Sequence, residues 1–107
     1  MRALGGRRVL IFTGTLTADL LLGDVHSLKG KRAVVRPIVA ELRRRYAVAA
    51  AEVGDHDLHR RVQVGVATVA GDAGQVADVL DACERLLADR PEVTLPSTHR
   101  QLFSDTD

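Results

Sequence analysis

The apolar residues fall into six successive segments of strand-like or helix-like spacing, and the order of these segments limits the fold more than any other feature. Apolar residues alternate with small or polar ones over 9–22 and 62–70, and more weakly over 46–54 and 93–95. Over 28–45 and 72–89 they recur every three or four residues instead. Alternation is typical of half-buried strands, and the longer spacing is typical of amphipathic helices. The order strand, helix, strand, strand, helix, strand predicts an α+β ferredoxin-like βαββαβ two-layer sandwich, an antiparallel sheet with both helices on one face.

Capping and helix-breaking residues set the predicted boundaries. Ser27 and Asp72 precede the two helical segments and can each accept from the free amides of a first turn. Gln75 follows Asp72 at capping-box spacing. Pro37 cannot donate to the carbonyl of Ala33, so we expect a kink in the first helix or a late start. Pro96 limits the last strand to about 93–95, which predicts a flexible basic leader over 1–8, one domain over 9–96 and a polar tail over 97–107.

Composition indicates a single domain of the cytoplasm. The chain has 107 residues, of which 46% are apolar and 27% charged, as in ordinary globular domains. Its single cysteine, Cys83, cannot form an intramolecular disulfide and lies on the apolar face of the second helix, so we expect a buried thiol in a reducing compartment. No apolar run approaches the roughly 20 residues that cross a membrane, and no uninterrupted apolar segment follows the first arginines. We therefore expect no membrane partner and no signal peptide.

Charge is divided unequally between the two helical segments. The first carries seven basic residues against Glu41, a net of +6, and the second carries five acidic residues against Arg85, a net of −4. Four of the first helix's basic residues share one helical face, a geometry that can follow phosphates. The alternative is that two neighbouring helices of opposite sign are solvated and partly pair with each other. The candidate contacts to ribosomal RNA or another polyanion are Lys29, Lys31, Arg32, Arg36, Arg43, Arg44, Arg60 and Arg61.

Aromatic residues make up 3% of the chain, and this argues against the commonest RNA-binding mode of the fold. That mode stacks bases on aromatic side chains of the open sheet face. Of the aromatic residues, Phe12 has the parity of the core and Tyr46 lies at the end of a helix. The predicted open face carries small residues instead, which suit a flat protein surface. Self-association as a homo-oligomer, through this face or a sheet edge, is the alternative function.

No group of residues predicts catalysis, a cofactor, a metal site or a small-molecule ligand. There is no carboxylate pair, activated nucleophile or phosphate-binding loop. Four residues with ligand chemistry crowd into one loop, Asp55, His56, Asp57 and His59, with Asp24 and His26 elsewhere. Their spacing matches no recognised metal site, so we interpret this loop as a polar turn. We expect a protein that is not an enzyme.

Several short segments together resemble a known family. They are HSLKGKR at 26–32, AEV at 51–53 followed by DHDL at 55–58 and Arg61, GVA at 65–67, and PEV at 91–93. In this order they are similar to the YlxP-like family, small bacterial proteins of unknown function, over about residues 10–96. The resemblance implies a ferredoxin-like fold and a gene close to those of translation initiation and ribosome-binding factors. It therefore implies a role around RNA or the ribosome, and together with the lack of a catalytic group we expect a non-enzymatic accessory protein. The chain departs from the family at Gly30, at Pro37 and at His59, where the family usually has glutamate, an uninterrupted helix and an aromatic residue.

Overall fold

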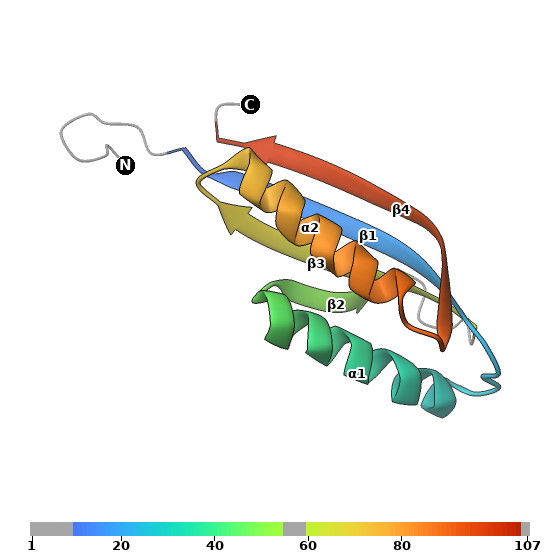
Figure 1. The fold of residues 1–107 in the computed structure, drawn as a ribbon. Helices are drawn as coiled ribbons and strands as arrows, with labels where there is room; N and C mark the ends of the chain where they lie inside the picture. The colour runs from blue at the N-terminus through green and yellow to red at the C-terminus, as the bar shows by residue number, and fades with distance from the viewer. Residues whose placement is uncertain (1–9, 55–59, 106–107) are drawn as a thin grey trace.

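The computed structural model describes residues 10–54 and 60–105, and its elements follow the predicted order. They are β1 (Phe12–Leu22), α1 (Leu28–Tyr46), β2 (Ala49–Val53), β3 (Arg61–Ala70), α2 (Ala73–Ala88) and β4 (Val93–Ser104). The strands form an antiparallel sheet in the order β2-β3-β1-β4, and both helices cover the same face of it (Figure 1). The predicted ferredoxin-like α+β sandwich is confirmed.

Alternation along β1 divides the sheet into a buried face and an open face. Leu16, Ala18, Leu20 and Leu22 are at most 1% exposed and point toward the helices. The odd-numbered residues between them are half-buried and lie on the open face. The buried layer is completed by apolar side chains from β3 and both helices, among them Val62, Val64, Val66, Val35, Ile38, Leu42, Leu80, Cys83 and Leu87.

Gly14 lets α2 lie close to β1. A Cβ atom built at this position would lie 2.3 Å from Cγ1 of Val76 and 3.0 Å from Cδ1 of Leu80. Real Cβ atoms do not approach other carbons to 2.3 Å, so with any larger residue either Val76 would change rotamer or α2 would move away from the sheet.

Both predicted helix caps are present. The Ser27 hydroxyl accepts from the Gly30 amide at 3.0 Å, and the Asp72 carboxylate accepts from the amides of Gly74 and Gln75. The expected late start of the first helix is wrong, because α1 continues without a break through Pro37. Pro37 and Ala33 both lie on the exposed side of α1, where water can satisfy the carbonyl that loses its donor.

The last strand is much longer than predicted. β4 continues through Pro96 to Ser104 and pairs with β1 over nearly its whole length, so the predicted end at about 95 and the polar tail from 97 are wrong. The register shifts between Asp19 and Leu21 of β1, which places Pro96 at a bulge. At a bulge on an edge strand a proline removes no ladder hydrogen bond, so it does not end the strand.

Neither helix in the described part of the chain has the length and apolar character needed to cross a membrane.

Candidate polyanion-binding surface

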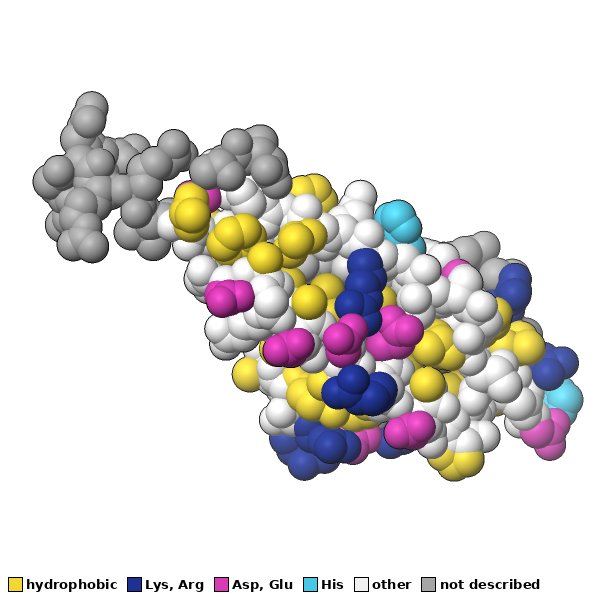
Figure 2. Space-filling view, turned by 45° about the horizontal axis from the view of Figure 1, so that its top comes forward, with side chains coloured by type: hydrophobic (Ala, Val, Ile, Leu, Met, Phe, Trp, Pro, Cys, Tyr) yellow, Lys and Arg dark blue, Asp and Glu magenta, His cyan; other side chains and the backbone are white. Residues whose placement is uncertain are grey.

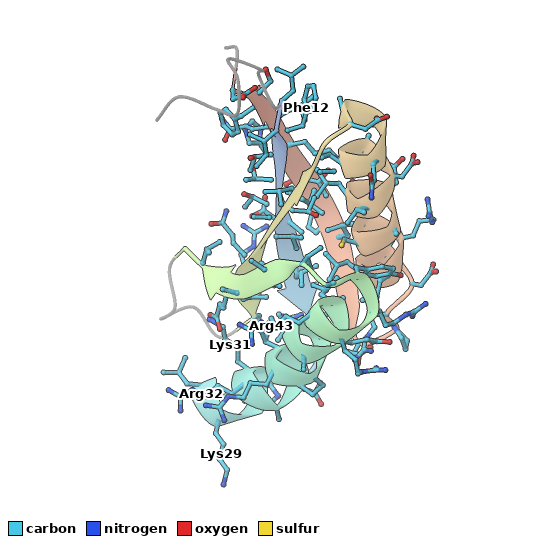
Figure 3. All side chains as sticks on the ribbon, turned by 90° about the vertical axis from the view of Figure 1, so that its left-hand side faces the viewer. Phe12, Lys29, Lys31, Arg32 and Arg43 are labelled. Atoms are coloured by element: carbon cyan, nitrogen blue, oxygen red, sulfur yellow. The ribbon has the colours of Figure 1, made fainter. Side chains whose placement is uncertain are left out.

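The outer side of α1 presents a row of cations, which we call the basic face of α1: Lys29, Arg32, Arg36, Arg43 and Arg44. All five residues are exposed. Figure 3 shows Lys29 and Arg32 projecting away from the sheet. Within residues 10–54 and 60–105, Lys29, Arg32, Arg36 and Arg44 form no ion pair. Their charge is therefore available to a partner outside the molecule.

The acidic residues of α2 do not neutralise this face in the described structure. Asp81 and Glu84 both bind Arg100 of β4, at 2.8 and 3.0 Å. On α1 itself, Glu41 binds Arg90, which follows α2, at 2.6 Å. Figure 2 shows acidic and basic side chains side by side over α2. The pairing of α2 acids with α1 bases, the alternative expected from the sequence, does not occur among these residues.

Lys31 belongs to the interior and not to the basic face. It is 2% exposed, and its Nζ atom lies 3.0 Å from Oε2 of Glu52 on β2. A buried amine needs such a partner, because removing its charge from water is costly. The sequence carried a signal for this position: Lys31 precedes Val35 and Ile38 at four- and seven-residue spacing and so shares their apolar side.

Arg43 joins α1 to the outer edge of the sheet. Its Nε–H donates to the carbonyl of Ala50 on β2 at 2.9 Å. β2 is an edge strand, and this bond occupies one of its outward backbone acceptors. Arg43 therefore has a structural role, and the rest of its guanidinium group remains on the basic face.

The other two predicted contacts, Arg60 and Arg61, lie just before and at the start of β3, not on α1. Arg60 Nε–H donates to the carbonyls of Leu22 and Gly23, at 3.3 and 3.1 Å, and so anchors the chain where β1 ends. Arg61 begins β3 and has the parity of the open sheet face, where its charge acts on Asp19. Arg60 is therefore close in the fold to the segment that leads into α1.

A polar row crosses the open face and was not predicted. The carboxylate of Asp19 accepts from the Ser97 hydroxyl on β4 and from the Gln63 amide on β3, the latter at 2.8 Å. These two bonds, with a smaller contribution from the positive charge of Arg61, hold the pKa of Asp19 below its usual value. The alternation placed Asp19 on this face, but its partners are 44 and 78 residues away along the chain, and no local pattern connects them.

Small side chains surround a shallow depression of about 500 Å³ beside this row. Its lining comes from β1, β2 and β3: Thr15, Leu16, Thr17, Ala49, Ala50, Ala51, Val53, Gly65, Val66 and Ala67. No aromatic side chain is among them. The sequence predicted small residues for the whole open face, and Phe103 of β4 departs from this because its strand was predicted to end at about 95. Phe103 lies at one end of the sheet, 48% exposed, and its β1 partner is Thr13. Self-association through the open face stays a prediction.

The other residues with ligand or nucleophile chemistry form no site in the described structure. Cys83 is fully buried, and burial raises the pKa of its thiol, as expected for a structural cysteine. His26 Nε2 lies 2.7 Å from Asp24 on the surface. Residues 10–54 and 60–105 contain no group of three side chains that could hold a metal ion, and the Asp55–His59 loop lies outside the described residues.

Comparison with known proteins gives the family. Residues 13–100, from the first strand to the middle of the last, match the family described as "Protein of unknown function (DUF503)". The chain belongs to the DUF503 family. It is also similar to the uncharacterized protein YlxP of Bacillus subtilis (strain 168), with 27% identity over 90 residues that cover 84% of this chain and 98% of that protein. The predicted YlxP-like family is confirmed.

Proposed function

We propose that this DUF503 protein is a non-enzymatic RNA-binding accessory factor of the ribosome and that the basic face of α1 contacts the RNA backbone. The observation that supports this most directly is the lack of internal ion pairs for Lys29, Arg32, Arg36 and Arg44 within the described residues. A folded protein that holds four cations on one helix side without partners is suited to an external polyanion.

The geometry favours backbone contact over base recognition. Lys29, Arg32 and Arg36 are three and four residues apart, so they lie one above the other along about two turns of α1. Such a row can follow successive phosphates. Base stacking on a sheet uses several aromatic side chains, whereas the lining of the open-face depression has none and Phe103 lies at one end of the sheet. Binding of this kind depends on RNA shape and charge more than on sequence.

The direct test measures how affinity depends on salt. Purified bacterial ribosomal RNA and intact ribosomal subunits are the two probes, studied by filter binding and by co-sedimentation over a series of potassium chloride concentrations. The affected variant is Arg32→Glu combined with Arg36→Glu. We expect weaker binding and a shallower dependence of log affinity on log salt, by roughly 0.7 for each phosphate of single-stranded RNA that the variant no longer neutralises.

A matched control comes from α2. Arg36→Glu and Arg85→Glu make the same charge change on exposed positions of two helices, so a nonspecific effect of net charge would be equal in both. The proposal requires Arg36→Glu to weaken binding clearly more than Arg85→Glu does. Equal effects, or co-sedimentation unchanged by the double charge reversal, would overturn it.

A further inference from the structure

β4 is an edge strand whose outer backbone is open to solvent in the described structure. The sheet order ends at β4, and no described strand lies beyond it. Residues 98–103 are all exposed. An edge of this kind is a template for another strand unless the chain blocks it.

The hydrogen-bond pattern shows which groups of β4 point outward. The Asp105 amide donates to the carbonyl of Ile11, so this pair is bonded toward β1. In an antiparallel ladder bonded and non-bonded pairs alternate. After the bulge, from Ser97 onward, the odd-numbered residues of β4 therefore bond to β1, and the N–H and C=O groups of Thr98, Arg100 and Leu102 point away from the sheet. The same alternation gives the observed bond from Leu22 to Arg60 on the other side of β1.

The opposite edge of the sheet, formed by β2, is less open to another strand than the β4 edge. β2 has five residues, and Arg43 occupies the outward carbonyl of Ala50. β4 has twelve residues, and its proline lies at the bulge near its start. Natural proteins protect edges with short strands, prolines, bulges or covering groups. On β4 the proline and the bulge come before Ser97 and leave residues 97–104 in regular register with β1.

The side chains along β4 leave room for a second strand. Arg100 is drawn back over α2 by Asp81 and Glu84, so its charge is balanced within the molecule. Leu102 and Phe103 are 54% and 48% exposed. Leu102 also lines a groove of about 180 Å³ between α2 and β4, together with Ala73, Val76, Ala77, Leu80, Arg100 and Gln101. Figure 2 shows the apolar side chains gathered near the start of α2.

We propose that β4 pairs with β4 of a second copy of this chain, antiparallel and about a two-fold axis at Arg100. This register places Thr98 opposite Leu102 of the partner and Arg100 opposite the same residue of the partner. Three residues in each copy then exchange all their outward backbone groups, which makes six hydrogen bonds. An antiparallel edge is self-complementary under a two-fold axis, so a second copy fits it without any further sequence requirement. This interface is independent of the basic face of α1.

The test is the mass in solution of wild type and two edge variants, measured by light scattering after gel filtration over a range of concentrations. Leu102→Lys places a charge on the edge, and Thr98→Pro removes an outward N–H without touching the ladder to β1. We expect wild type at twice the chain mass of 11.6 kDa and both variants at 11.6 kDa. Thr94→Lys, on the same strand but before the bulge, should remain dimeric.

Circular dichroism establishes that each variant is folded. A wild type that stays at 11.6 kDa at every concentration overturns the proposal. A dimer that survives both edge variants also overturns it and points to the open sheet face instead. Because Leu102→Lys and Thr98→Pro act by different means, failure of one to fold leaves the other as the test.

Discussion

The substitution Gly14→Ala tests the close contact between α2 and β1 with a single added carbon. That carbon would lie 2.3 Å from Cγ1 of Val76, where ordinary contacts are 3.4–4 Å. Val76 and Leu80 are 1% and 3% exposed and pack against the sheet, so moving either side chain disturbs core contacts. The helix must shift by about an ångström, or Val76 must leave its rotamer, and changes of this kind typically cost about 1–3 kcal/mol.

Part of this cost is offset in the unfolded chain. Alanine has fewer unfolded conformations than glycine, which favours the folded state by about 0.4–1 kcal/mol. We therefore expect a net loss of about 1–2 kcal/mol. With an unfolding entropy of about 2.1 cal/mol/K per residue, this lowers the melting temperature by about 4–9 °C.

Gly71→Ala is the matched control, because a Cβ atom at Gly71 would meet nothing within 4 Å. It should leave stability unchanged or raise it slightly. The assay is urea denaturation followed by circular dichroism, since the chain has no tryptophan. If Gly14→Ala is as stable as Gly71→Ala, α2 does not lie as close to β1 as described and the packing argument fails.

Three further predictions concern the ionisable groups. Lys31→Met should lower the free energy of unfolding, measured by urea denaturation, by about 3 kcal/mol. This is the lower end of the range for a broken buried ion pair, because Glu52 keeps some contact with water, and the added change Glu52→Leu should restore most of the loss. Weaker RNA binding at unchanged stability would contradict this structural role. The lowered pKa of Asp19 stabilises the fold above the ordinary aspartate pKa, and this contribution is lost as pH falls through the folded value. Melting temperature measured against pH should therefore show a flatter acid limb for Asp19→Asn than for the wild type, and an unchanged acid limb would refute the assignment. The Cys83 thiol, fully buried and with a raised pKa, should react with an aromatic disulfide reagent only in urea, and rapid labelling of the folded protein would show that α2 opens.

The fold was predictable because each element that buries one side has apolar residues at a regular spacing in the sequence. β1 and β3 alternate so regularly that their register on the sheet follows from parity alone. The apolar pattern of β4 is weaker, since its residues from Pro96 to Phe103 are all exposed and do not alternate between core and surface. A proline that would end a central strand is tolerated at the bulge of an edge strand, and the sequence does not state which strand is at the edge.

The candidate site was predictable in its charges but not in their partners. The basic face of α1 follows from helical spacing, which is local. Whether an acidic neighbour neutralises it depends on the packing of α2, whose Asp81 and Glu84 bind Arg100 of β4 instead. Lys31 was wrongly predicted as a surface contact because its charge was considered alone. Its spacing from Val35 and Ile38 indicated the burial that the structure shows.

The two proposed surfaces lie at opposite edges of the sheet, and this position connects them. A two-fold axis between β4 strands runs perpendicular to the sheet, so the dimer would have one continuous sheet with all helices on the same side. In the order β2-β3-β1-β4, α1 packs toward β2, the edge farthest from the dimer contact. From β2 to β2 of the partner there are then seven strand spacings, a distance of about 34 Å. The two basic faces would lie on the helix side at about this separation. An RNA long enough to bridge them would bind the dimer more tightly than a short one, because binding to the first face raises the effective concentration of the RNA at the second. Thr98→Pro should remove this advantage and leave the affinity for short RNA unchanged, because the basic face of α1 is not altered.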